Sequence, residues 1–177
     1  MKKFIIAKQF KIVILILIAL SICFSCRSNC KPVEIGKLSD TYITAWKDFY
    51  PSAAFAAGDK DSAFRFETLS NKKIEQWLAL NKKVLSETQN IHSDLSIDDR
   101  VDIKILQKKI RHEIETWEVE RAHENSPALY SGLISQALTY VLVRSNLSPG
   151  EKIKAISNRL TGIRKICAFA INRLKSG

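Results

Sequence analysis

Apolar side chains recur every three or four residues along most of this chain, which is the spacing of one face of an α-helix. Stripes of this kind occupy residues 34–50, 70–92, 97–123, 127–143 and 151–174. No run alternates between apolar and polar residues for long enough to indicate a β-strand. The pattern therefore predicts an all-α protein of about six or seven helices in an antiparallel array, because the connections between the stripes are short.

Several residues mark where these helices should begin and end. Pro51 stops the first stripe, and the small-residue segment 51–61 that follows is typical of a tight loop in which Gly58 takes a positive φ. The sequence Ser-Pro-Gly-Glu at 148–151 has the composition of a helix N-terminus, with a Ser cap, a Pro in the first turn and a Glu that completes a capping box. Gly162 lies inside the last stripe and predicts a bend or a break there.

The two longest stripes each predict a buried face and a charged face. In residues 97–123 we expect Trp117 to end a buried seam, while Glu113 joins the charged residues outside it. In residues 151–174 we expect Arg159 on the charged outer face and Cys167 buried as a free thiol. The apolar side chains expected inside that last helix are Ile153, Ile156, Leu160, Ile163, Ile166, Ala170 and Leu174.

Residues 1–25 have the features of an export signal. Lysines precede an uncharged apolar run, residues 12–25, whose helical rise of roughly 21 Å is shorter than the roughly 30 Å core of a bilayer. A cleaved signal therefore fits better than an uncleaved anchor. The run ends in a sequence that resembles a bacterial lipoprotein box, in which a Cys sulfur takes the diacylglycerol. The small Ser25 favours Cys26 as the lipidated residue, Cys23 is the alternative, and an ordinary cleaved signal without lipid is another.

These features divide the chain into a lipoprotein-type signal segment (1–25), a tether (26–33) and a helical domain (34–177). The formal net charge of the whole chain is +10, and the lysines of the signal account for part of that surplus. The rest is too modest and too dispersed to indicate nucleic-acid binding. It is compatible with an anionic membrane surface, which the lipid anchor would make a partner of the protein.

The patterns that could support catalysis are incomplete. A helical zinc site needs two His four residues apart with a Glu between them that activates the bound water. The sequence from His112 to Thr116 begins in this way but has Thr at the second ligand position, and the sequence from His123 to Pro127 fails at the same place. Nucleophile elbows and phosphate-binding glycine loops are also absent from the sequence. We therefore expect no catalytic residue, no metal ligand and no cofactor in this chain.

Three stretches of the chain together resemble a known family. Along the chain they are Phe49–Ala54, the pair Gly58-Asp59 and Trp117–Tyr130, and in this order they are similar to the amino-terminal part of domain-of-unknown-function family 885. The resemblance covers about residues 39–174. Members of that family are long helical bacterial proteins, often secreted or lipid-anchored, that are similar to zinc metallopeptidases.

The family has a recurring pattern, aromatic-Glu-x-(Asn/Asp)-Pro-x-x-Tyr. The resemblance implies roles for the three residues that match its Glu, Pro and Tyr, which are Glu124, Pro127 and Tyr130. They would turn the long helix back on the domain, or Glu124 and Tyr130 would line a substrate channel. The chain departs from the family at His123, where an aromatic residue is usual, and at Ser126, where Asn or Asp is usual.

The zinc motif of the family, His-Glu-x-x-Pro-Gly-His, lies downstream of the region that resembles this chain. The resemblance therefore implies an envelope-anchored lipoprotein that carries the non-catalytic N-terminal helical region of a truncated or split product. Zinc would belong to a missing C-terminal half, which would be a partner, as would another envelope protein. The alternative is a stand-alone helical surface lipoprotein that acts as a binding or scaffold module for envelope or host proteins. Both readings place the protein at the bacterial cell envelope, exported and lipid-anchored on the periplasmic or surface side.

Overall fold

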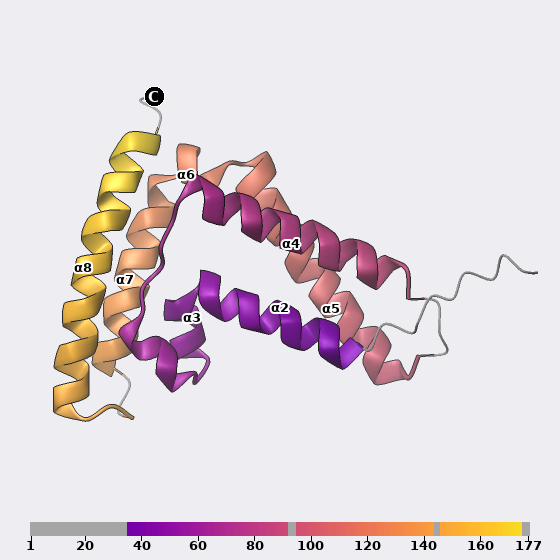
Figure 1. Cartoon of the computed structure of the whole chain (residues 1–177), viewed down its shortest axis with the longest axis horizontal. Coiled ribbons are helices and arrows are strands. Elements are labelled where there is room, and N and C mark those ends of the chain that lie inside the picture. The colour runs from indigo at the N-terminus through magenta and orange to yellow at the C-terminus, as the bar shows by residue number, and fades with distance from the viewer. Residues whose placement is uncertain (1–34, 92–94, 144–145, 175–177) are drawn as a thin grey trace, which may run out of the picture. The chain divides into compact units, whose positions relative to one another are not determined.

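The computed structural model describes residues 35–91, 95–143 and 146–174, all of which belong to one compact unit of the chain. Helices account for all the regular structure in these ranges, so the prediction of an all-α array is confirmed (Figure 1). The α-helices are α2 (Ile35–Phe49), α3 (Pro51–Ala56), α4 (Asn71–Gln89), α5 (Ile97–Ile114), α6 (Ala122–Asn125), α7 (Pro127–Val143) and α8 (Pro149–Arg173), with a 3₁₀ turn, η1 (Lys60–Phe64), and a π turn, η2 (Glu115–Val119).

The helices pack as two groups that share one core. Helix α4 lies against α5 and α2, and α8 lies against α7, while α3 and η1 connect the groups by contacting α7 and α8 (Figure 1). The main core is aromatic: Phe49 stacks on Trp77 with ring centroids 4.9 Å apart and meets the edge of Trp117 at 5.3 Å. Aromatic pairs of this kind add about 0.5–1.5 kcal/mol each beyond the burial of their surfaces. No helix in the described ranges combines the length and the apolarity needed to cross a bilayer.

Three helices, α4, α5 and α8, begin directly after a serine whose side chain caps the first turn. The Ser70 hydroxyl accepts a hydrogen bond from the backbone N–H of Lys73 at the start of α4. At the start of α8, Ser148 and Glu151 form the predicted capping box, in which each side chain accepts a hydrogen bond from the other residue's backbone N–H. These ends are predictable because the contacts that fix them lie within one helical turn.

The segment after Pro51 differs from the predicted loop. Pro51 ends α2 but also begins the short helix α3, because a proline in the first turn loses no helical hydrogen bond and its fixed φ suits a helix. The positive φ predicted for Gly58 is confirmed, at 110°.

The predicted single helix over residues 97–123 is also wrong in its last part. Helix α5 ends at Ile114, the backbone widens into the π turn η2, and Arg121 adopts a left-handed conformation with φ of 49° before α6 begins. The π turn presents Trp117 to the core, where its indole N–H donates a hydrogen bond to the Tyr50 hydroxyl at 2.8 Å. A contact with so distant a residue leaves no periodic signal in the local sequence.

Helix α8 is continuous, so the break predicted at Gly162 does not occur. The glycine serves close packing instead: a Cβ at Gly162 would lie 2.6 Å from Cδ1 of Phe66 and 2.9 Å from its Cβ. The ring of Phe66, from the segment between η1 and α4, therefore occupies the space of the missing side chain.

The buried face of α8 is rotated from the predicted one. Its buried residues are Ala155, Arg159, Ile166 and Ala170. By contrast, Ile153 is 71% exposed, Leu160 is 49% exposed, and Cys167 is exposed rather than buried. The prediction that Arg159 lies on the outer face is wrong, because carbonyl acceptors from two other segments, η1 and α7, surround its guanidinium inside the fold.

Candidate functional site

A buried carboxylate, Glu113, lies where α5 faces α2 and α4. Glu113 is 3% exposed, and its Oε2 accepts hydrogen bonds from the Tyr50 hydroxyl at 2.6 Å and from the Trp77 indole N–H at 3.0 Å. The Lys109 ammonium lies 2.6 Å from Oε1, one helical turn away. The expectation that Glu113 is a surface charge is therefore wrong, because donors from α4 and from the start of α3 compensate its burial.

Tyr50 connects this carboxylate to the aromatic core. Its hydroxyl donates to Glu113 and accepts the indole N–H of Trp117. Burial, followed by the negative charge of Glu113, raises the pKa of Tyr50 well above its ordinary value. Tyr50 therefore stays protonated and acts as a fixed donor, which is an architectural arrangement and not that of a general base.

A cavity of about 390 Å³ opens beside Glu113, between α2, α3, α5 and α7. Trp46 and Leu129 contribute apolar walls, and Lys109, His112 and Gln136 contribute polar groups. The volume is in the range of small-molecule sites. The carboxylate in its lining is already held by a tyrosine, a tryptophan and a lysine.

A second buried charge, Arg159 of α8, is fully inaccessible to solvent. Its Nε donates to the carbonyl of Ala63 at 2.9 Å, Nη2 to the carbonyl of Ser62 at 3.1 Å, and Nη1 to the carbonyl of Ala137 at 2.5 Å. These acceptors belong to η1 and α7, so one side chain joins three segments. The planar guanidinium suits this role because its five N–H groups point in fixed directions.

Glu67 is the anion whose charge acts on this arginine, and Ser52 connects the two side chains by hydrogen bonds. The backbone N–H and the hydroxyl of Ser52 donate to the Glu67 carboxylate at 2.9 and 2.8 Å, and the same hydroxyl accepts from Nη1 of Arg159 at 3.5 Å. Burial raises the pKa of Glu67, although the bonds from Ser52 and the charge of Arg159 oppose it. Burial likewise lowers the pKa of Arg159, and the charge of Glu67 opposes that shift.

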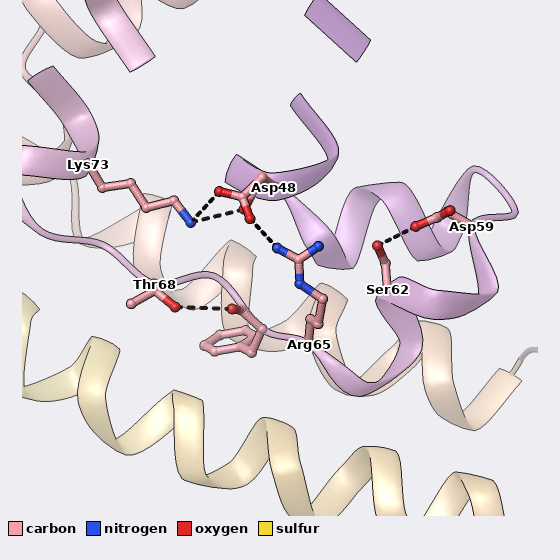
Figure 2. Close-up of polar contacts among 7 residues, drawn as sticks. Asp48, Asp59, Ser62, Arg65, Thr68 and Lys73 are labelled. Carbon is pink, nitrogen blue, oxygen red and sulfur yellow. Dashed lines mark hydrogen bonds and ion pairs between the residues drawn. The ribbon is translucent and has the colours of Figure 1, made fainter. Parts of the chain in front are cut away.

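Figure 2 shows a third polar cluster, which fixes the segment between η1 and α4 to the end of α2. The Asp48 carboxylate pairs with Arg65 and with the Lys73 ammonium, which lies 3.2 Å from Oδ2. Partial burial favours a higher pKa for Asp48, but the hydrogen bonds and charges of Lys73 and Arg65 outweigh it, so the pKa is lowered. Nearby, the Ser62 hydroxyl donates to Asp59 at 2.5 Å and so closes the turn that follows Gly58.

Two of the three residues that the family resemblance singles out lie inside the fold. Tyr130 is 4% exposed and its hydroxyl donates to the carbonyl of His123 at 2.5 Å, while Glu124 is 6% exposed and lies 2.6 Å from Nη2 of Arg121. Pro127 is exposed and begins α7. None of the three lines the cavity beside Glu113. Their architectural or channel-lining role stays a prediction.

His123 is buried with one ring nitrogen unpaired. The side chain stacks on Trp117 with ring centroids 5.8 Å apart, Nε2 lies 3.6 Å from Oε1 of Glu124, and Nδ1 is buried without a hydrogen-bond partner. Burial lowers the pKa of His123, although the charge of Glu124 opposes that shift. The imidazole is thus held neutral at pH 7.

The described part of the chain holds no group of three His, Cys, Asp or Glu side chains that could bind a metal ion. The predicted lipidation sites, Cys26 and its alternative Cys23, lie outside the described residues. No protein-family model, no curated protein and no solved structure matches this chain.

Sequence reasoning missed the two buried charges that organise these clusters. For Arg159 a signal was present: it shares a helix face with Ala155, Ile166 and Ala170, which are small or aliphatic. An arginine surrounded by such residues is typical of a buried cation that has found fixed acceptors. For Glu113 the neighbouring lysines and glutamates in the sequence conceal the signal.

Proposed function

We propose that this protein is an envelope-anchored lipoprotein whose helical domain is a non-catalytic module, similar to the N-terminal helical region of the metallopeptidase-like family 885. The non-catalytic part of the proposal is supported by the contacts of the buried charged side chains. Glu67, Glu113 and Arg159 are each held by hydrogen bonds or ion pairs from other parts of the domain. Buried charged groups that are fully engaged inside the fold are typical of side chains that stabilise a scaffold.

Under this proposal, the zinc-binding half that the resemblance implies would belong to another polypeptide or to a longer product. A helical zinc site needs paired His ligands, and here the exposed His112 and the stacked His123 belong to separate helices, α5 and α6. The purified chain, incubated with casein in the presence and absence of added zinc, should show no hydrolysis above a buffer control. Hydrolysis that a chelator abolishes, and that zinc restores, would overturn the non-catalytic assignment.

A second candidate is a stand-alone binding or scaffold module for envelope or host proteins, and one observation favours it. Helix α8 exposes large aliphatic side chains, Ile153, Leu160 and Ile171, on the side away from its buried residues. Apolar surface of this kind marks interaction sites when its members are contiguous. The two candidates differ in the size of the native product. An antibody raised against residues 96–123 should detect a band no larger than the chain's 20.1 kDa for a stand-alone module, because removal of the signal lowers the mass, and a much larger band for one part of a longer enzyme.

A further inference from the structure

The cavity beside Glu113 has an ion pair in its wall. Lys109 and Glu113 both line the cavity, one helical turn apart on α5, and the lysine ammonium lies 2.6 Å from Oε1 of the carboxylate. The Glu113 side chain is buried, whereas that of Lys109 is 45% exposed. The volume of about 390 Å³ is larger than one ammonium group requires and leaves room for a ligand.

The two oxygens of the Glu113 carboxylate are held by different kinds of group. Oε2 accepts hydrogen bonds from the Tyr50 hydroxyl and the Trp77 indole N–H, both of which are packed in the aromatic core. Oε1 is paired with the ammonium of Lys109, which is carried on a flexible stem and can turn out into water. Since that ammonium is rehydrated when it leaves, another ammonium can replace it at Oε1 without changing the buried charge.

The remaining walls of the cavity suit the apolar part of such a ligand. Trp46 and Tyr50 both line it, and their ring centroids lie 6.4 Å apart. Leu129 and Leu133 of α7 add aliphatic surface. Aromatic rings attract cations as well as apolar groups, so a wall of this composition favours an organic cation.

An anionic ligand suits the cavity less well. Lys109 and the exposed His112 could contact an anion at the rim. The anion would however lie close to the carboxylate of Glu113 in a poorly hydrated site, where like charges repel strongly. It would also draw Lys109 away from the buried carboxylate that this lysine neutralises.

We propose that this cavity binds a small primary amine in its ammonium form. The ligand ammonium takes the place of the Lys109 ammonium at Oε1 of Glu113, and an apolar substituent lies against Trp46 and the leucines of α7. Lys109 is then a competitor built into the site. The inference goes beyond the envelope role proposed above and depends on neither the lipid anchor nor the zinc question.

The probes are phenethylammonium and hydrocinnamate, which carries a carboxylate on a similar apolar group. Each is titrated into the isotopically labelled full chain in neutral detergent and phosphate buffer, and the backbone amide signals of Thr116 and Gly132, which line the cavity, are followed by NMR. Phenethylammonium should shift these signals and hydrocinnamate should not. Glu113→Gln should weaken binding about tenfold or more, because the ligand loses a charge-assisted hydrogen bond in a buried site.

Two further variants keep the test decisive if Glu113→Gln folds poorly. Lys109→Ala removes the competitor and should raise the affinity about threefold, whereas it would weaken the binding of any ligand that needs the lysine. Gly132→Leu should block binding without altering a charge, because a Cβ at Gly132 meets nothing within 4 Å and the added side chain would occupy the cavity. The matched control is Lys108→Ala, which removes an exposed side chain outside the lining and should leave the affinity unchanged.

The proposal is overturned if phenethylammonium binds neither the wild type nor Lys109→Ala, or if hydrocinnamate binds as tightly. It is also overturned if Lys109→Ala weakens the binding of the amine, which would show that the lysine is a ligand contact and not a competitor. Binding that Gly132→Leu leaves intact would place the amine outside this cavity and would overturn the proposal as well.

Discussion

Replacing Arg159 by Ala tests the most consequential contact in the domain. The substitution removes the donors of the Ala63, Ser62 and Ala137 carbonyls and leaves the buried Glu67 carboxylate without the positive charge that opposes its desolvation. It also removes a guanidinium that lies 5.3 Å from the ring centroid of Phe55. Segments from η1, α7 and α8 lose their common partner at once.

The expected loss of stability follows from these contacts. Each hydrogen bond from the charged guanidinium contributes about 1.5–3 kcal/mol, and its removal also leaves the buried Glu67 carboxylate without the positive charge of Arg159. The contributions overlap, because the domain relaxes and water enters, so we expect a total near 5 kcal/mol. Natural domains unfold with about 5–15 kcal/mol, so Arg159→Ala should leave a large unfolded fraction. Arg159→Lys keeps the charge but reaches fewer carbonyls, and it should lose about half as much.

The assay is urea unfolding followed by circular dichroism at the helical band and by tryptophan fluorescence. Arg164→Ala is the matched control on the same helix, because its side chain is exposed and its removal should change the free energy of unfolding by no more than about 0.5 kcal/mol. If the free energy of unfolding of Arg159→Ala lies within about 1 kcal/mol of that control, the arginine does not hold these segments together.

Three further substitutions test other parts of the fold. Gly162→Ala should destabilise the domain by about 1–3 kcal/mol, because the added Cβ has no space beside Phe66. In the control Gly132→Ala the added Cβ meets nothing within 4 Å, so the variant should gain up to about 1 kcal/mol from helix propensity. Equal urea midpoints for the two variants would contradict both expectations. His123→Phe should stabilise the protein more at pH 5 than at pH 8. Burial lowers the pKa of His123, so the unfolded state binds a proton there more readily than the folded state. The wild type therefore keeps its full stability above about pH 6.5 and loses stability as the pH falls. Parallel pH profiles of the variant and the wild type would contradict this prediction. Glu113→Ala should lower the free energy of unfolding by about 3 kcal/mol, because the buried Tyr50 hydroxyl and Trp77 indole N–H lose their acceptor. The control Glu115→Ala removes an exposed side chain and should cost less than about 0.5 kcal/mol. Similar costs for the two variants would argue against the buried network.

The parts of this fold that could be predicted from the sequence depend on neighbouring residues. The capping box of Ser148 and Glu151 forms within one turn, and the positive φ of Gly58 is a property of one residue. The helical periodicity records burial along each helix and therefore predicted the all-α class.

The parts that could not be predicted depend on partners far away in the sequence. Arg159 is buried because acceptors in η1 and α7 surround it, and Gly162 keeps a continuous helix because Phe66 fills its side. The apolar stripe of residues 151–174 misled in the same way: its spacing is that of a buried face, but the structure leaves Ile153 and Leu160 exposed. For the candidate site, the sequence identified the helix that carries Glu113, while its burial depends on Tyr50 and Trp77 from other parts of the chain.

We have proposed that this helical domain works at the envelope as a lipid-anchored module. Intact-mass measurement of the native protein, purified from the membrane fraction of the producing cells and fragmented at its N-terminus, would show the lipid itself. We expect a chain that begins at Cys26, or at its alternative Cys23, with a diacylglycerol group on the sulfur of that residue. A chain in which both cysteines are unmodified, or one recovered without lipid from the soluble fraction, would contradict it.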